Sequence, residues 1–357
     1  MAATEQDPVF PAERVQAFIV SALLALGLPE ADAQTCAQRM TEADLRGVDT
    51  HGIFRLPHYA RRIQAGGINR RPHVRPLRET PVTALVDGDN AMGHVVMTAA
   101  TQLAIRKAAQ SGLAWVGVFH SNHAGPAAVY STMPVSHDMV GLYMTVANAN
   151  HMAPWGGVEL ILGTNPISVA IPAGEEPPIA LDMATTVSSY GKIKLAAQKG
   201  ESIPVGWMVD RRGQPLTDPQ RSHEGFLLPI GGYKGYGLNV VIGMLAGLLN
   251  GAAFGRNVVD FNQDLATPNN GGHMIFAMRV DCFRPPDEFK RDMDRSIREI
   301  RASQRMEGVD RIWLPGEMEF HAIRERRERG IPIAPAVVRQ LRDLADALGL
   351  PFTLTGS

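Results

Sequence analysis

The sequence predicts an α+β fold in which a large mixed, mainly antiparallel sheet packs beside helices contributed by both ends of the chain. Three observations support this class. Helical patterns fill most of the first 65 residues. Strand-like runs follow between residues 82 and 282, with too few helices between them for steady βαβ alternation. Helical patterns then return from residue 286 onward.

The N-terminal segment predicts three short helices, at 11–28, 29–46 and 54–65. The first two begin with a proline and end at a glycine, and each carries an apolar stripe at helical spacing. Three helices with tight turns also occur in helix-turn-helix DNA readers. The formal net charge of -1 and the lack of a basic recognition face argue against that class.

The remaining elements follow from period-two and period-3.6 patterns bounded by turn residues. Strands are expected at 82–87, 113–119, 140–146, 167–171, 178–182 and 274–282. Helices are expected at 95–111, 126–136, 239–253, 286–306 and 336–348. We therefore expect an N-terminal helical segment (1–80), a central α+β domain (81–285) and a C-terminal helical segment (286–357) that packs with the first.

Composition excludes several classes of protein. The 357 residues are 45% hydrophobic and 20% charged, and the near-zero net charge argues against nucleic acid or anionic lipid as partners. The longest apolar stretch, 239–254, is too short for a bilayer span. The first residues lack a secretory signal pattern, so we expect a cytoplasmic protein. Cys36 and Cys282 are expected to be buried, reduced thiols.

Thr50, His51 and Arg55 form the most informative cluster in the chain. A guanidinium can grip a carboxylate at two points, and an imidazole can give a proton to a carbonyl oxygen as hydride arrives at its carbon. These are the groups that reduction of a 2-oxo acid needs. The same spacing also fits a helix cap at Thr50, a surface histidine, and an ion pair of Arg55 with Asp44 or Asp49.

The segment His120-Ser-Asn-His123 follows an apolar strand, and strand ends are common places for site residues. Its His-x-x-His spacing suggests zinc, but no third ligand stands at a helpful distance in the sequence. We therefore predict no metal, and expect either polar residues of a ligand site or a hydrogen-bonded turn.

Three further loops could serve a site. Thr164 lies in a turn before a strand, and Asp182 could fix a histidine tautomer. Lys234 lies in the glycine-rich segment 231–237, a possible cradle for a phosphate or carboxamide. Turn, cap and hinge roles explain these loops equally well. The Rossmann glycine fingerprint and the Walker A motif are both missing, so a dinucleotide would need another kind of cradle.

Seven motifs in order carry a resemblance over residues 12 to 350. They are Asp-x-Arg-Gly-Val-x-Thr-His-Gly-Ile-x-Arg-x-Pro-x-Tyr from Asp44, Ser-Asn-His, Ala-Pro-Trp-Gly-Gly, Gly-Thr-Asn-Pro, Asp-Met-Ala-Thr, Lys-Gly-Tyr-Gly-Leu and Leu-Pro-Gly-Glu. Together they resemble the malate/L-lactate dehydrogenase family of the non-Rossmann type. That family includes ureidoglycolate and sulfolactate dehydrogenases, diketogulonate reductase and Δ1-piperideine-2-carboxylate reductase.

The resemblance implies a homodimer that uses NAD or NADP, with a non-Rossmann cofactor domain, in agreement with the missing fingerprint. It implies reversible hydride transfer between the nicotinamide and C2 of a small 2-oxo acid. The corresponding 2-hydroxy acid would be one such as malate, lactate or ureidoglycolate. A cyclic 2-imino carboxylate, reduced by a ketimine reductase, is the alternative. A non-catalytic dinucleotide-binding protein and a metal-dependent hydrolase built on His120 and His123 are the alternatives of other classes.

The resemblance also implies roles for individual residues. His51 resembles the proton donor of the ketimine-reductase branch, with Thr50 and Asp182 as its partners, and His123 resembles the acid/base of the ureidoglycolate branch. Arg55 resembles the carboxylate clamp. The substrate pocket would also include Thr164, Met183 and Ala184. Cofactor contacts would come from Ser121, Asn122, His123, Asn148, Asp182, Met183, Ala184, Lys234, Pro315, Gly316 and Glu317.

Two departures from the family pattern bear on these roles. Thr50 stands where serine is common, and its extra methyl narrows the rotamer choice while the hydroxyl is kept. The segment 146–153 differs from the usual Thr-Asn-Ala-Ser-Pro run of the family. This difference affects the assignment of Asn148 as a cofactor contact. Two histidines compete for the acid role, and the sequence does not choose between them.

Overall fold

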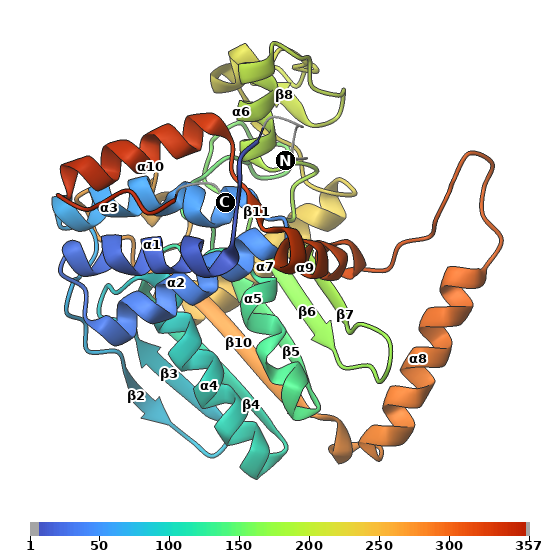
Figure 1. The fold of residues 1–357 in the computed structure, drawn as a ribbon. Coiled ribbons are helices and arrows are strands. Elements are labelled where there is room, and N and C mark those ends of the chain that lie inside the picture. The colour runs from blue at the N-terminus through green and yellow to red at the C-terminus, as the bar shows by residue number, and fades with distance from the viewer. Residues whose placement is uncertain (1–6, 355–357) are drawn as a thin grey trace.

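A seven-stranded sheet forms the centre of the structure, a computed structural model that describes residues 7–354 (Figure 1). Its spatial order is β2-β3-β4-β10-β5-β6-β7, with β3 parallel to β4 and every other neighbouring pair antiparallel. This confirms the predicted α+β class with a mixed, mainly antiparallel sheet. The strands are β2 (Arg75–Glu79), β3 (Thr83–Asp87), β4 (Leu113–Ser121), β5 (Met139–Thr145), β6 (Ile167–Ile171), β7 (Ile179–Met183) and β10 (Gly271–Arg279).

Helices cover both faces of this sheet. Alternate residues of a strand point to opposite faces, and β10 shows this directly. Ile275 and Ala277 pack in the core shared with α4 (Gly93–Ser111) and α5 (Ala128–Ser131), whereas Met274 packs with Ile242 of α7 (Tyr233–Ala246). The central strands are therefore buried on both sides, which explains their nearly continuous apolar sequences.

A second core is built from both ends of the chain. It joins α1 (Ala12–Ala25), α2 (Glu30–Leu45), α3 (Leu56–Ala65) and α10 (Pro335–Ala347), which lie together in Figure 1. The short strand β1 (Val9–Phe10) pairs with β11 (Ile331–Pro332) and ties the two ends directly. The predicted domain boundaries themselves stay a prediction.

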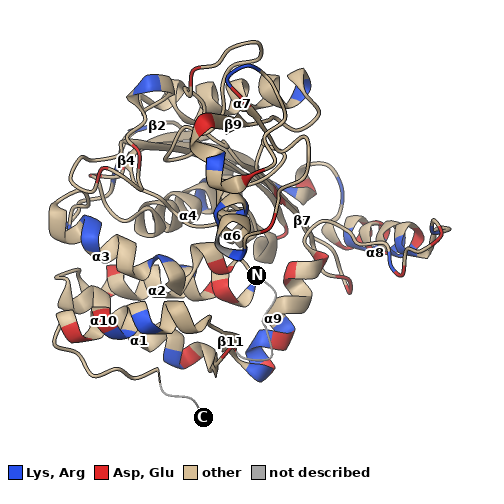
Figure 2. Ribbon diagram, turned by 90° about the horizontal axis from the view of Figure 1, so that it is seen from above, with Lys and Arg blue, Asp and Glu red and all other residues tan. Residues whose placement is uncertain are grey.

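The helix α8 (Pro286–Ala302) extends away from the rest of the molecule, and basic and acidic residues alternate along it and α9 (Glu317–Arg329) (Figure 2). Its buried Asp294 accepts hydrogen bonds from the backbone N–H groups of Gly174, Glu175 and Glu176, at 2.9, 2.9 and 3.1 Å. Arg298 adds ion pairs to Glu175 and Glu176. The loop between β6 and β7 therefore anchors the helix.

Several predicted boundaries need correction. The helix expected at 239–253 begins at Tyr233, inside the segment predicted as a glycine-rich loop, and ends at Ala246. The helix expected at 126–136 is only α5 followed by a 3-10 turn at Met133–His137, because Pro134 lacks the N–H that a continuing helix needs. Cys36 is buried as predicted, but Cys282 is exposed in the turn after β10.

Several elements escaped prediction altogether. They are β2, α6 (Tyr190–Lys199), the small hairpin of β8 (Met208–Asp210) and β9 (Gly225–Leu227), and most of α9. None of the helices in residues 7–354 combines the length and hydropathy that a bilayer crossing needs.

Candidate functional site

Two 3-10 turns, Asp49–His51 and Ile53–Arg55, carry the first group of site residues and lead into α3. The Thr50 hydroxyl lies 2.9 Å from Nδ1 of His51. The Arg55 Nε donates to the Thr50 carbonyl at 2.8 Å. The structure therefore gathers these three residues into one cluster. Arg55 does not form the ion pair with Asp44 or Asp49 that the sequence also allowed, and Asp49 pairs with Arg326 instead.

His123, which follows β4, lies directly against His51. Their ring centroids are 5.4 Å apart and their planes are 26° apart. The Tyr59 hydroxyl lies 2.6 Å from Nδ1 of His123, and the ring of Phe261 stacks on the His123 ring with centroids 5.1 Å apart. Both candidate proton donors therefore belong to one site, together with Tyr59 and Phe261, which the sequence analysis did not single out.

Both imidazoles are neutral at neutral pH. Burial, with the nearby Arg55 charge, lowers the pKa of His51 to about 3. Burial, His51 and Arg55 hold the pKa of His123 well below its ordinary value. Both rings keep partial solvent access although protein atoms surround them.

Arg55 is fixed at one end and free at the other. Its Nε is engaged by Thr50, and its guanidinium lies 5.5 Å from the Phe54 ring and 6.0 Å from the Phe261 ring. No hydrogen bond within residues 7–354 engages its two terminal nitrogens. A planar fork held by Nε presents those two N–H edges for two-point contact with a carboxylate.

Thr164 belongs to a buried polar network that joins two loops to α7. Its carbonyl accepts from the Thr185 N–H at 2.9 Å, and the Asn239 side chain donates to Thr185 Oγ1 at 2.7 Å and to the Gly163 carbonyl at 2.8 Å. Asn165 donates to Asn239 at 3.1 Å. Sequence reasoning missed Asn165, Thr185 and Asn239. An asparagine in the middle of an apolar helix was the available signal, because a buried amide needs partners.

Asp182, at the end of β7, has a different partner from the one predicted. Its carboxylate accepts from the Ala128 N–H at 2.7 Å, and no hydrogen bond to His51 occurs in the described structure. Burial raises the pKa of Asp182 to about 6. Asp182 is exposed to solvent although many protein atoms surround its carboxyl group. Met183 and Ala184 follow it and are half-buried.

Ser121 and Asn122 are fully buried after β4. The Asn122 amide donates to the carbonyls of Asn90 and Ala91, at 3.0 and 2.9 Å, which fixes the chain just before His123. Its Oδ1 is buried without a partner in residues 7–354. The Asn148 carbonyl accepts from the Phe261 N–H at 2.8 Å. These contacts place the backbone around the paired histidines.

Lys234 is exposed in the first turn of α7, after Gly232, whose φ is +66°. The helix has no side-chain cap there, so its first N–H groups remain available to an anion.

The segment Pro315–Glu317 packs on β7. The Pro315 carbonyl accepts from the Ala180 N–H at 2.9 Å, and Gly316 fits against Ala180 with φ +86°. Glu317 is buried and pairs with Arg301, at 3.1 Å, and with Arg311. Its carboxylate therefore already has cationic partners.

His120 lies apart from His123. It pairs with Asp87 at 3.1 Å on the surface, whereas His123 faces Tyr59. Within residues 7–354 no group of three or more His, Cys, Asp or Glu side chains is arranged to hold a metal ion.

Comparisons with known proteins agree with this architecture. The family model described as malate/L-lactate dehydrogenase matches residues 10–342. A malate dehydrogenase of Pyrococcus abyssi is 39% identical over 95% of both chains, and a ureidoglycolate dehydrogenase (NAD(+)) of Escherichia coli is 34% identical over 94% of this chain and 95% of the other. The solved structure of malate dehydrogenase from Pyrococcus horikoshii superposes with a TM-score of 0.90, 36% identity and 98% coverage of both chains. These matches, together with the site geometry, show that the chain belongs to the malate/L-lactate dehydrogenase family.

Proposed function

We propose that the protein is an NAD(P)-dependent oxidoreductase that transfers a hydride between a nicotinamide and C2 of a small 2-oxo or 2-hydroxy acid. The observation that carries this proposal is the placement of Arg55 and two neutral imidazoles in one cluster. The named activities of the similar proteins, on malate and on ureidoglycolate, support the same substrate class.

Arg55 binds the substrate carboxylate. Because Nε is held by the Thr50 carbonyl, the guanidinium plane is fixed before substrate arrives, and less freedom is lost on binding. The aromatic rings of Phe54 and Phe261 flank the cation and limit its hydration. The C2 oxygen of a 2-oxo acid is adjacent to the carboxylate. Binding of that carboxylate at Arg55 therefore brings the C2 oxygen close to the imidazoles of His51 and His123.

His51 or His123 handles the proton. A neutral imidazole can accept the hydroxyl proton when a 2-hydroxy acid is oxidised. In the opposite direction the imidazole must first gain a proton. Arg55 contributes to the low pKa of both rings, and a bound carboxylate offsets that charge and raises their proton affinity. Binding of the substrate carboxylate therefore favours protonation of the imidazole that donates the proton.

The residues present fit a dinucleotide without a Rossmann turn. The exposed Lys234 and the uncapped first turn of α7 suit a phosphate, and the unpartnered Oδ1 of Asn122 can accept from an amide. The other residues that we expect to contact the cofactor are Ser121, His123, Asn148, Asp182, Met183, Ala184, Pro315, Gly316 and Glu317. When bound, the nicotinamide supplies or accepts the hydride.

A homodimer is part of the proposal. Exposed apolar side chains lie on α7, in the turn that follows it and in the loop 155–160, and they include Val241, Met244, Leu248 and Trp155. Contiguous exposed apolar surface is typical of a protein interface. Light scattering would measure the mass, and a monomer at micromolar concentration would contradict this part. A cytoplasmic location stays a prediction.

The test is an assay of reduced nicotinamide absorbance with NAD and NADP, in both directions. The panel contains malate, lactate, ureidoglycolate and Δ1-piperideine-2-carboxylate. Arg55→Lys should raise the KM for the acid at least ~10-fold, since a point charge cannot replace the fork. Arg339→Lys, at an exposed position of α10, is the matched control. Cofactor binding without turnover of any acid would favour the non-catalytic alternative.

A further inference from the structure

We propose that Asp44 is a positioning residue that holds the turn carrying His51 and Arg55 in its active geometry. The inference rests on the proposed function and concerns a residue behind the site. Asp44 lies near the end of α2, is 2% exposed, and touches no atom that would bind substrate. Its side chain reaches the turn between the two site residues.

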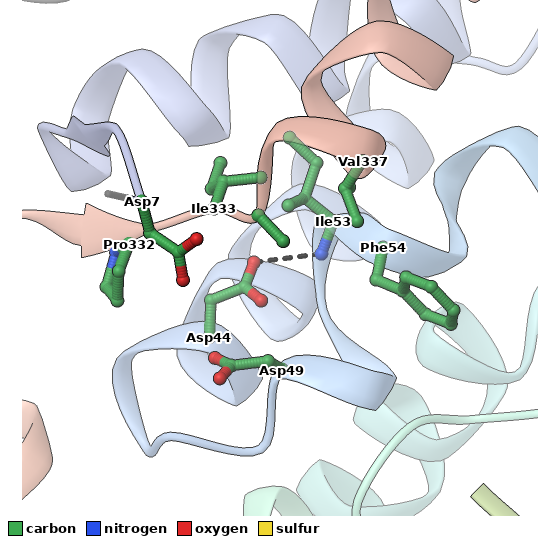
Figure 3. Close-up of a pocket in the computed structure, with 9 residues that line it drawn as sticks. Asp7, Asp44, Asp49, Ile53, Phe54, Pro332, Ile333 and Val337 are labelled. Carbon is green, nitrogen blue, oxygen red and sulfur yellow. Dashed lines mark hydrogen bonds between the residues drawn. The ribbon is translucent and has the colours of Figure 1, made fainter. Parts of the chain in front are cut away.

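The first contact is a buried hydrogen bond. The Ile53 N–H donates to Asp44 Oδ2 at 2.8 Å, as Figure 3 shows. Ile53 lies between His51 and Arg55, so this bond fixes the backbone from which both side chains extend. Without it, a buried N–H would lose its partner, which costs about 1–3 kcal/mol.

The second contact is steric. A Cβ added at Gly52 would lie 1.8 Å from Asp44 Oδ1. The carboxyl therefore occupies the space that any other residue at position 52 would need. The turn and the carboxyl fit together as a pair, and neither can move without disturbing the other.

Arg326 of α9 holds the same turn from another side. It donates to the Asp44 carbonyl and pairs with the Asp49 carboxylate. The turn is therefore held by α2 and by α9, two elements far apart in the sequence.

The surroundings of the turn combine carboxylates with apolar side chains. A small cavity of about 30 Å³ lies beside the turn, and Asp49, Ile53, Phe54 and Val337 are among its walls (Figure 3). Asp44 and Arg326 add polar contacts to the apolar packing of the buried Ile53, and together these contacts hold the turn. Burial also raises the pKa of Asp44, which makes the neutral asparagine a close mimic.

Five variants test the proposal. Asp44→Ala removes the acceptor, and Asp44→Asn keeps an oxygen in its place. Asp294→Ala is the matched control, because Asp294 is also a buried carboxyl that accepts backbone N–H groups, but on α8. Gly174→Ala controls for Gly52→Ala, since its added Cβ would lie 2.5 Å from Asp294 Oδ2.

The kinetic test compares the effect on kcat/KM for the acid with the effect on the KM for the nicotinamide cofactor. Asp44→Ala should lower kcat/KM for the acid ~10- to 100-fold while the KM for the nicotinamide cofactor stays within ~2-fold, because misplacement by ~1 Å costs about that much. Asp44→Asn should restore activity to within ~5-fold. Asp294→Ala should lower the melting temperature without this split. Equal kinetics in Asp44→Ala and wild type, measured well below both melting temperatures, would overturn the proposal.

Two further measurements do not depend on turnover. Amide hydrogen exchange over residues 49–56 should speed up in Asp44→Ala and stay slow in Asp294→Ala. Gly52→Ala should destabilise the wild-type chain by more than it destabilises Asp44→Ala, since the smaller side chain leaves room for the new methyl. If wild type turns over no acid, the proposed function fails, and exchange still decides whether Asp44 holds the turn.

Discussion

The imidazole ring of His51 stacks on the ring of His123, with centroids 5.4 Å apart. One ring comes from the turn before α3, and the other comes from the loop after β4. Two neutral bases of the same type thus lie in contact at one site, and either could handle the proton. Single substitutions can separate their roles.

His51→Asn and His123→Asn should affect different kinetic constants. The variant that lacks the proton donor should lose at least ~10²-fold in kcat, and the other should change mainly the KM for the acid. Steady-state kinetics in both directions measure the difference. His120→Asn is the control, because that surface residue pairs with Asp87. Near-wild-type kcat in both site variants would refute the assignment of either histidine.

Tyr59→Phe should separate positioning from stability. The change removes the 2.6 Å hydrogen bond to His123 and leaves its Nδ1 without that partner, so the free energy of unfolding should fall by about 1–2 kcal/mol. We expect kcat to fall ~10-fold as well, since the ring loses its fixed tautomer. Tyr143→Phe removes a similar Tyr–His bond to His273 and should lower stability with little effect on kcat. Equal kinetic effects in the two variants would contradict a positioning role for Tyr59.

Stability should fall steeply on acidification. Burial lowers the pKa of His51 and of His94 to about 3, whereas the unfolded value is near 6.5. The unfolded chain therefore binds more protons below pH 6.5, and stability decreases as pH falls from 6.5 toward 3. Each such group contributes a slope of up to about 1.4 kcal/mol per pH unit.

Urea unfolding between pH 4.5 and 7.5 measures this slope. His94→Leu should flatten it, because neither ring nitrogen of His94 has a hydrogen-bond partner in residues 7–354. His137→Asn, at an exposed position, should leave it unchanged. The same slope in all three proteins would show that burial of His94 does not drive acid unfolding.

Gly316→Ala should be strongly destabilising. The residue has φ +86°, and an added Cβ would lie 2.8 Å from both Cβ and O of Ala180. We expect a loss of about 2–4 kcal/mol, from backbone strain and overpacking together. Gly349→Ala has φ +67° but open space around it, so it should lose only about 1 kcal/mol. Thermal and urea unfolding of both variants test whether contact with β7 makes the difference.

The sequence predicted local relationships well. Strands expected at 113–119, 140–146 and 167–171 appear as β4, β5 and β6, because apolar runs bounded by turn residues are a property of short segments. The cluster of Thr50, His51 and Arg55 could be anticipated for the same reason.

Relationships across the chain could not be predicted. The stacking of His123 on His51, and the network of Asn165, Thr185 and Asn239, depend on how distant loops meet. The early start of α7 was missed because glycines disfavour helices, yet here Gly235 fits closely against the Ile230 carbonyl. α9 has few buried residues and no apolar stripe, so its pattern resembled a surface segment.

The pairing of Val9–Phe10 with Ile331–Pro332 has a consequence for how the chain is made. β1 is synthesised long before its partner β11, so the two strands can pair only after the residues between them have been made. Until then, the apolar faces of the first three helices lack the covering of α10 and are open to unwanted association. Completion of this layer therefore requires segments that are synthesised more than 260 residues after the first helices (335 minus 65 is 270).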